Sequence, residues 1–387
     1  MNKNKRNPGA LAALTGAALA LPAIAQLAQA ADMPAKTELG YRYSDYKEDD
    51  VDAALVMVGT EERYDIDTHQ FRLVAPVGDS SSLTVDAMYE TMTGASAMSV
   101  VETPQGDSML IMTGASIKEE RTDLSAELRR YDDHGSKAVA LGYSTEDDYE
   151  AINGSLDLER KSADGITTWS GGVGFSYDEL EPIQEEGINR VISEDRWFFN
   201  GYVARAKVHS PVWQSQVGLY LGVYDGYLDD PYRSRDIRPD TRQQVAVNAR
   251  SRYFLSGLKA ALNLDYRFYN DDWGISSHTL EFTWHQTLTD ALRISPRIRY
   301  YSQSQADFYL DADSGLRQGE QSSDYRLSPY GAIAYGVGAG YYQSNYSLVL
   351  YVEQYDSDAD YALKSVSKAN PFLVDYTLVT VGLDYRF

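Results

Sequence analysis

The residues that could do chemistry in this sequence are mainly charged side chains at alternate positions of short segments. Seven arginines in the second half of the chain share this placement: Arg250, Arg252, Arg267, Arg293, Arg297, Arg299 and Arg326. Six carboxylates in the first half share it too: Asp86, Glu90, Asp123, Glu127, Asp157 and Glu159. Because alternate residues of a β-strand point to the same face, we expect each set to line one wall of an interior, with the basic wall opposite the acidic one.

Two such walls have two interpretations. In a water-filled passage, a basic wall facing an acidic wall would orient and filter polar or charged solutes. Alternatively, the two sets pair as salt bridges that plug or stiffen the interior. Pairing and lining do not exclude each other, so the sequence leaves both interpretations open.

Nucleophiles and metal ligands are scarce. The chain has no Cys and five His, which excludes thiolate metal sites and Cys nucleophiles. Glu281 and His285 share one predicted strand face, but four residues of strand separate them by about 13 Å, too far for one metal ion. His69 and His278 fall on apolar faces, and no G-x-S-x-G motif is present. Residues 356–360 begin like a calcium loop but lack its later Gly and Glu. We therefore expect no enzyme and no metal site.

A four-residue motif, Thr-Gly-Ala-Ser, occurs at residues 93–96 and again at 113–116. It resembles the site at which bacterial flavin transferases esterify FMN onto a threonine. That site usually has Asp three residues before the threonine, where this chain has Glu90 and Leu110. Four small residues also make an ordinary loop. We expect no cofactor, with covalent FMN at Thr93 as the alternative.

The elements that must position these side chains are β-strands. Residues 379–387 alternate Val, Val, Leu, Tyr and Phe with Thr, Gly, Asp and Arg, which is the period of a strand with one apolar and one polar face. The aromatic last residue, with Tyr two positions before it, resembles the terminal strand signal of bacterial outer-membrane barrels. The alternation recurs upstream in segments of about ten residues, the length that a tilted strand needs to cross a bilayer.

Sixteen such segments follow one another along the chain. They begin near Thr37, Tyr64, Ser82, Arg121, Lys137, Glu150, Ile166, Asp195, Ser215, Gln244, Lys259, Ile275, Ala291, Tyr325, Tyr342 and Phe372. Short and long connections alternate between them, although two connections on the long side, near Glu146 and Asn270, are brief. Both chain ends fall on the side of the short turns, as in bacterial outer-membrane barrels. We predict an all-β fold, an antiparallel up-and-down transmembrane barrel of sixteen strands, with fourteen or eighteen strands as alternatives. A soluble secreted all-β protein is the competing interpretation.

The first thirty residues have the three regions of a secretory signal peptide. Lys3, Lys5 and Arg6 precede an apolar run at 11–25, and Ala-Gln-Ala ends at residue 30. We therefore divide the chain into a signal peptide at 1–30 and an outer-membrane β-barrel at 31–387. The predicted location is the outer membrane of a Gram-negative bacterium.

Composition excludes several classes of protein. The formal net charge of −22 opposes nucleic-acid binding, which needs a basic face. Tyrosine is abundant, with 31 Tyr against 10 Phe, which is typical of strands with many aromatic side chains that are partly exposed to water. The mean hydropathy is −0.42, and no mature stretch has the roughly 18 apolar residues of a spanning helix.

Several segments resemble a large family of proteobacterial outer-membrane proteins described only as a domain of unknown function. They are MTGAS at 92–96, YSTEDD at 143–148, DPY at 230–232 with RP at 238–239, YRFYNDDWGISSHTL at 266–280, RYYSQSQADFY at 299–309 and GLDYRF at 382–387. The resemblance implies a barrel and no established catalytic residues. Members are often encoded beside a flavin transferase, which implies a role near extracytoplasmic electron transfer.

The function expected from these observations is a porin-like channel for small polar solutes or ions. The alternative is a non-conducting barrel that holds a flavin-linked electron-transfer partner or a lipoprotein. Expected partners are outer-membrane lipids and the barrel-assembly machinery, which would read the carboxy-terminal strand. A homo-oligomer and a periplasmic lipoprotein are further candidate partners, and nucleic acid is not.

Overall fold

The computed structural model describes residues 33–387 except 114–116, 185–187 and 314–318. Its main element is a closed antiparallel barrel of sixteen strands, each paired with the next barrel strand along the chain. The ring closes where the first strand pairs with the last, with Glu38 opposite Arg386. The predicted fold and strand number are thus confirmed. The predicted signal peptide, residues 1–30, lies outside the described residues.

The described residues form two sheets and four single-turn 3-10 helices. The barrel strands are β1 (Glu38–Glu48), β3 (Asp65–Val77), β4 (Ser81–Gly94), β7 (Ile117–Asp132), β8 (Gly135–Thr145), β9 (Tyr149–Lys161), β10 (Thr167–Leu180), β11 (Glu194–Ser210), β12 (Trp213–Gly226), β13 (Thr241–Leu255), β14 (Ala260–Asp271), β15 (Ser276–Thr287), β16 (Leu292–Gln303), β17 (Tyr330–Tyr342), β18 (Tyr346–Asp358) and β19 (Tyr376–Arg386). A small separate sheet has the order β2 (Val56–Val58), β6 (Ser108–Met112), β5 (Ala97–Glu102). The 3-10 helices are η1 (Ala53–Leu55), η2 (Ser256–Leu258), η3 (Tyr325–Leu327) and η4 (Ala359–Tyr361). In the described part of the chain, no helix is long and apolar enough to cross a membrane.

The barrel is apolar outside and polar inside because its strands alternate as the sequence predicts. On β9, Leu156 and Leu158 are 59% and 46% exposed on the outer surface, while Asp157 between them points inward and accepts a hydrogen bond from Tyr202. In a membrane protein, exposed leucine at this density is the surface that faces lipid. The register of every strand therefore decides which charged groups reach the interior.

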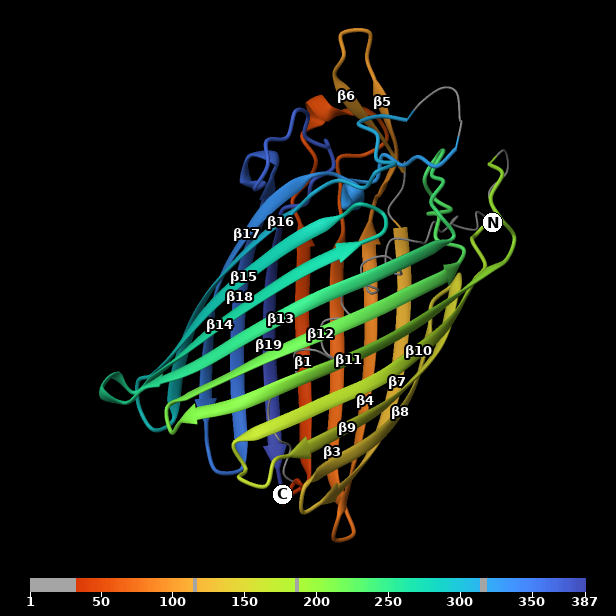
Figure 1. The fold of residues 1–387 in the computed structure, drawn as a ribbon. Coiled ribbons are helices and arrows are strands. Elements are labelled where there is room, and N and C mark those ends of the chain that lie inside the picture. The colour runs from red at the N-terminus through yellow and green to blue at the C-terminus, as the bar shows by residue number, and fades with distance from the viewer. Residues whose placement is uncertain (1–32, 114–116, 185–187, 314–318) are drawn as a thin grey trace, which may run out of the picture.

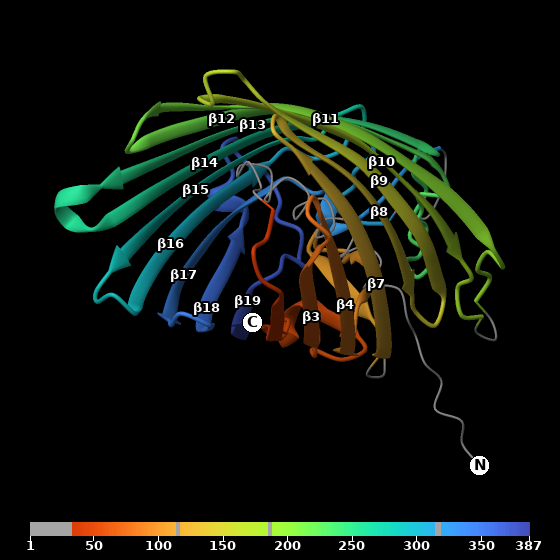
Figure 2. The same cartoon turned by 90° about the horizontal axis from the view of Figure 1, so that it is seen from below.

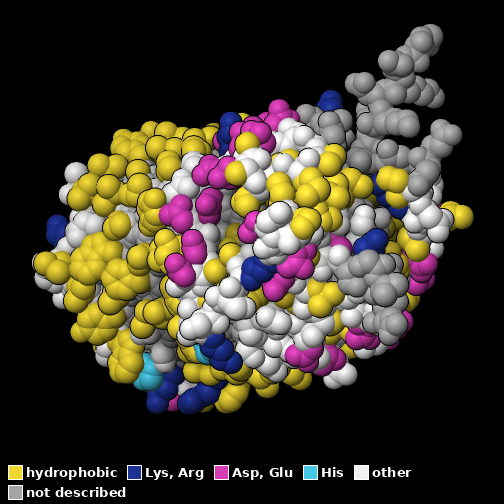
Figure 3. Space-filling model, turned by 90° about the horizontal axis from the view of Figure 1, so that it is seen from above, with side chains coloured by type: hydrophobic (Ala, Val, Ile, Leu, Met, Phe, Trp, Pro, Cys, Tyr) yellow, Lys and Arg dark blue, Asp and Glu magenta, His cyan; other side chains and the backbone are white. Residues whose placement is uncertain are grey.

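The two ends of the barrel differ. Short turns join the strands at one end, which also holds both termini of the described barrel (Figure 1). Long loops join most of the strands at the other end, where only the β8–β9 and β14–β15 connections are brief in the described residues. We call these two ends the turn end and the loop end. The view from the turn end shows the wall surrounding loops at the far end (Figure 2). From the loop end, acidic and basic side chains spread over the loops, while hydrophobic side chains gather on one flank (Figure 3).

The long loops pack on one another to form a structure that we call the cap. It consists of residues 49–64, 95–113, 227–240, 304–313, 319–329 and 359–375. One hydrophobic cluster joins four of these loops through Val51, Val100, Leu110, Ala312 and Phe372. The small sheet belongs to the cap, and the sequence analysis did not predict it. Three strands also begin a few residues later than predicted, at Tyr330, Tyr346 and Tyr376, because the residues before them belong to the cap or to a turn.

Candidate functional site

The charged residues singled out in the sequence lie on the inner side of the barrel wall, with the exception of Arg326. The arginines are on β13, β14 and β16: Arg250, Arg252, Arg267, Arg293, Arg297 and Arg299. The carboxylates are on β4, β7 and β9: Asp86, Glu90, Asp123, Glu127, Asp157 and Glu159. These two groups of strands lie on opposing parts of the ring.

The arginine wall is interleaved with carboxylates from neighbouring strands. Arg250 and Arg252 on β13 lie 3.3 and 2.8 Å from Asp265 on β14. Arg297 on β16 lies 2.5 Å from Glu281 on β15 and 3.1 Å from Glu353 on β18. These three arginines are therefore paired along the wall, rather than across the barrel interior. The sequence alone does not reveal these partners, because they depend on the register of adjacent strands.

The acidic wall is paired in the same local way. Asp86 on β4 lies 3.7 Å from Arg72 on β3, and Glu127 on β7 lies 2.9 Å from Arg129 on the same strand. Glu90 accepts a hydrogen bond of 2.9 Å from Thr68. Lining and pairing therefore coexist, as the sequence analysis allowed.

Exposure of the inward side chains changes along the barrel. The side chains of Arg72 and Asp86, in the middle of their strands, are 44% and 43% exposed. Nearer the loop end, the inward side chain of Arg121 is only 1% exposed. Charged groups in mid-barrel thus reach solvent inside the wall, whereas the cap covers those near the loop end.

The prediction that Arg326 lines the barrel wall is wrong. The sequence analysis placed it on a strand beginning near Tyr325, but the structure places it in η3, and β17 begins only at Tyr330. Asp324 ends the preceding extended segment and its side chain caps η3 by accepting a hydrogen bond from the Arg326 amide. A turn so capped cannot continue the strand alternation that the sequence pattern suggested. Arg326 therefore belongs to the cap.

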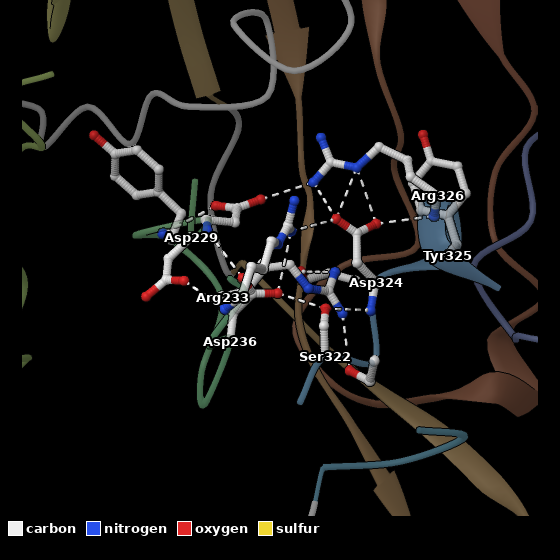
Figure 4. A network of polar contacts seen from close by, with 12 residues as sticks. Asp229, Arg233, Asp236, Ser322, Asp324, Tyr325 and Arg326 are labelled. Atoms are coloured by element: carbon white, nitrogen blue, oxygen red, sulfur yellow. Dashed lines mark hydrogen bonds and ion pairs between the residues drawn. The ribbon is translucent and has the colours of Figure 1, made fainter. Parts of the chain in front are cut away.

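An ionic network holds two cap loops together around Asp324 (Figure 4). Arg326 donates a hydrogen bond of 2.8 Å to Asp324 and one of 2.9 Å to Asp230. Arg238 donates one of 2.7 Å to Asp236 and one of 2.9 Å to Asp324. Asp230, Asp236 and Arg238 come from the loop between β12 and β13, whereas Asp324 and Arg326 come from the loop between β16 and β17. The network is thus a tertiary contact between segments far apart in sequence.

Electrostatics fix the charge state of this network. Burial alone would raise the pKa of Asp324, but attraction to Arg326, Arg233 and Arg238 outweighs it and holds that pKa well below its usual range. The carboxylate is fully buried, so it is stable only while these arginines surround it.

The cap is also attached to the inside of the wall. Gln303, an inward residue at the end of β16, donates hydrogen bonds of 3.0 Å to the Arg326 carbonyl and 2.6 Å to the Ser328 carbonyl. Beside it, Trp273 and Ile275 pack against Phe308 and Leu327 of the cap. The loop between β16 and β17 is therefore held inside the mouth of the barrel.

A third cluster lies at the loop end, on another part of the wall. It consists of Glu119 on β7 and of Glu146 and Asp148 in the connection between β8 and β9, all buried. Tyr232 of the cap donates its hydroxyl hydrogen bond to Asp148. Burial, with repulsion from Asp148, raises the pKa of Glu146 against the attraction of Arg121. This site could not be predicted from the sequence, because its residues meet only in the folded barrel.

The segments that carried the family resemblance meet at this end. YSTEDD supplies Glu146 and Asp148, DPY supplies Tyr232, and RYYSQSQADFY supplies Gln303 and Phe308. All of the segments except the carboxy-terminal one reach the cap. The sequence matches the family described as "Protein of unknown function (DUF3570)" over residues 11–370.

The chain belongs to the DUF3570 family.

Solved structures similar to this DUF3570 protein are outer-membrane barrels. A bacterial polysaccharide outer membrane secretin has a TM-score of 0.51 and 8% identity, over 92% of this chain and 100% of that one. CdiB from Acinetobacter baumannii has a TM-score of 0.52 and 7% identity, over 91% of this chain and 60% of that one. The translocator domain of the autotransporter NalP from Neisseria meningitidis has a TM-score of 0.38 and 12% identity, over 98% and 96%. No curated protein matches the chain. The first two likenesses show the fold alone.

The structure explains why the first Thr-Gly-Ala-Ser motif has a glycine at its second position. Gly94 ends β4 with a φ of +131°, and a Cβ there would lie 2.3 Å from the carbonyl oxygen of Arg63. Ala95 behind it is fully buried in the cap. Thr93 is exposed on the outer face of the wall, opposite Asp65 and Lys118, so its hydroxyl is accessible. In the second motif, Thr113 is buried, and residues 114–116 lie outside the described part.

The histidines considered as catalytic candidates lie apart from the carboxylate clusters. His69 bonds to Tyr41 at 2.8 Å and His278 to Tyr266 at 2.8 Å, both on the outer face of the wall. His285 points inward and bonds to Asn263 at 2.9 Å and to Ser295 at 2.8 Å. These contacts give each ring a structural partner.

Proposed function

We propose that this protein is a gated passage for small polar solutes or ions across the outer membrane. By the layout of outer-membrane barrels, the loop end faces the cell exterior and the turn end the periplasm. The cap is the gate, and the barrel interior beneath it is the passage.

The observation that carries this proposal is the exposed ion pair between Arg72 and Asp86, inside the wall at mid-height. Charged side chains exposed within a barrel need water around them, and sixteen-stranded barrels are wide enough to hold an aqueous channel. Side chains of both signs along the wall suit polar or charged solutes and disfavour apolar ones.

The cap supports gating rather than permanent opening. Its contacts with the wall are polar at Gln303 and apolar at Trp273, and its buried ions depend on one another. A segment held in this way can be released as a unit when one contact is lost. Solutes would then diffuse through water, selected by width and charge.

The cap also favours a second candidate function, a non-conducting barrel that holds an electron-transfer or lipoprotein partner. In that case the cap is a permanent part of the fold, and Thr93, exposed at the loop end, is the residue to carry FMN. A flavin absorption band on the purified chain, lost on Thr93→Val substitution, would favour this second function.

Swelling of liposomes that contain the refolded protein separates the two functions. Sugars of increasing mass would be tested on the wild type and on Arg326→Ala, with folding confirmed by a heat-dependent shift in gel mobility. Slow entry of small sugars into wild-type liposomes and faster entry with Arg326→Ala would support the gated passage. No entry with either folded protein would support the scaffold.

A further inference from the structure

Three carboxylates from two elements converge at the loop end of the barrel. One oxygen from each of Glu119, Glu146 and Asp148 lies within 4.8 Å of the other two, and all three residues are buried. Glu119 comes from β7, whereas the other two belong to the connection between β8 and β9. Like charges brought this close in a buried site repel strongly, so the fold must compensate them.

The second observation is the state of Glu146. Its side chain is fully buried, and among the described residues no N–H or hydroxyl group donates a hydrogen bond to either carboxylate oxygen. The backbone around it is fixed, because the Glu146 amide donates a hydrogen bond of 2.7 Å to the Tyr149 carbonyl. A buried carboxylate normally has its oxygens satisfied, so these two oxygens point to a ligand.

Charge gives the class of that ligand. Arg121 lies against the cluster, with its Nε 3.7 Å from Glu146, and it also donates a hydrogen bond of 3.0 Å to Ser144. When all three carboxylates are ionised, the single positive charge of Arg121 leaves the cluster with a net charge of −2. A divalent cation supplies the charge that balances them.

We propose that Glu119, Glu146 and Asp148 bind Ca²⁺. All three ligands are carboxylate oxygens, the donors that hard cations prefer. Ca²⁺ binds oxygens at about 2.3–2.6 Å, so its ligands can stand up to about 5 Å apart, whereas Mg²⁺ at about 2.1 Å requires them closer. The observed spacing therefore accommodates Ca²⁺ without rearrangement of the wall.

The site would connect the metal ion to the cap. Tyr232 donates its hydroxyl to one oxygen of Asp148, which leaves the other oxygen for the ion. Tyr232 also accepts a hydrogen bond of 3.0 Å from the Ile183 amide. Bound Ca²⁺ would fix Asp148 and, through Tyr232, hold two loops at the mouth of the barrel.

Calorimetric titration of the refolded full barrel with CaCl₂ tests the proposal. We expect the wild type to bind one equivalent of Ca²⁺, and Glu146→Gln to bind it with an affinity at least about tenfold lower. Glu120→Gln is the matched control, because Glu120 is the neighbouring residue on β7 and is exposed. This control should bind as the wild type does, and MgCl₂ should bind more weakly.

A second variant keeps the test independent of folding. Asp148→Asn should lose the same equivalent, and each variant would be scored only if its heat-dependent gel mobility shows a folded barrel. Calcium binding that is equal in wild type, Glu146→Gln and Asp148→Asn would overturn the proposal, because the ion would then bind at other acidic loops. Absence of binding to the folded wild type would overturn it too.

Discussion

The hydroxyl group of Tyr232 donates a hydrogen bond to the carboxylate of Asp148. It joins a cap loop, between β12 and β13, to the connection between β8 and β9, on another part of the ring. Together with the hydrogen bonds from Gln303 on β16 to the cap, this contact ties the cap to the wall at separate places. The loop end is therefore a folded structure in its own right, and its disruption should have local and measurable effects.

Removal of the Tyr232 hydroxyl should loosen one side of the cap. Tyr232→Phe leaves Asp148 buried without that donor, which costs about 1–3 kcal/mol locally. Hydrogen exchange of residues 227–240 should become faster, while exchange of the barrel strands stays the same. Tyr335→Phe, on the outer face of β17, is the matched control and should leave exchange unchanged. Equal exchange in both variants would show that the hydroxyl does not hold the loop.

Loss of the Asp324 carboxylate should release the loop between β16 and β17. Asp324→Ala leaves Arg238 and Arg326, both half-buried, without their shared partner, and breaking a buried ion pair costs up to about 3–5 kcal/mol. Limited proteolysis should then cut the cap, and the strands should stay protected. Asp132→Ala, which breaks an exposed pair with Arg160 at the turn end, should not change the cleavage pattern. Cleavage equal to wild type in Asp324→Ala would refute this account of the network.

The cap should loosen on acidification. The pKa of Asp324 is held far below its ordinary value in the folded protein, so its contribution to stability is full above the ordinary carboxyl pKa of about 4 and decreases progressively as the pH falls from that value toward the folded pKa. A spin label at Leu310→Cys reports this loosening without background, because the chain has no Cys. Label mobility should rise below about pH 4 in the wild-type background. In Asp324→Asn it should be high at every pH, and an identical pH profile in both proteins would contradict the prediction.

Removal of one wall arginine should change ion selectivity. Arg297→Gln leaves Glu281 and Glu353 without their shared cation, so the interior becomes more negative at that level. One charge in water at contact distance is worth about 1 kcal/mol, which corresponds to about a fivefold rise in the preference for cations over anions. Reversal potentials in a salt gradient measure this preference. Arg205→Gln, on the outer face of β11 beside Trp169, should leave it unchanged, and an equal shift in both variants would argue against wall selectivity.

The sequence was sufficient to predict the barrel because its signal is local. Alternation along residues 379–387 sets the two faces of β19 without knowledge of any other strand, and the same holds for the upstream segments. The count of sixteen and the inward positions of Arg250 and Asp86 follow from that period. Their partners, such as Asp265 for Arg250, depend on register between strands, which the period does not specify.

The cap could not be predicted because its contacts are non-local. The pattern at Arg326 continues the strand period, yet the capping interaction from Asp324 and the attraction of Asp230 turn the chain at that point. The spacing of Glu119, Glu146 and Asp148 along the sequence does not indicate a metal site, because Glu119 is on a different element from the other two. The expectation of no metal site rested on such spacings, and calcium titration now tests it.

The central claim is that a water-filled passage lies beneath a releasable cap, and single-channel recording in planar bilayers tests it most directly. The wild type and Asp324→Ala would be compared at several salt concentrations after folding is verified. We predict rare openings in the wild type and frequent steps in Asp324→Ala, with conductance that rises in proportion to salt. A folded Asp324→Ala barrel whose cap is cleavable by protease but which passes no current would contradict the account.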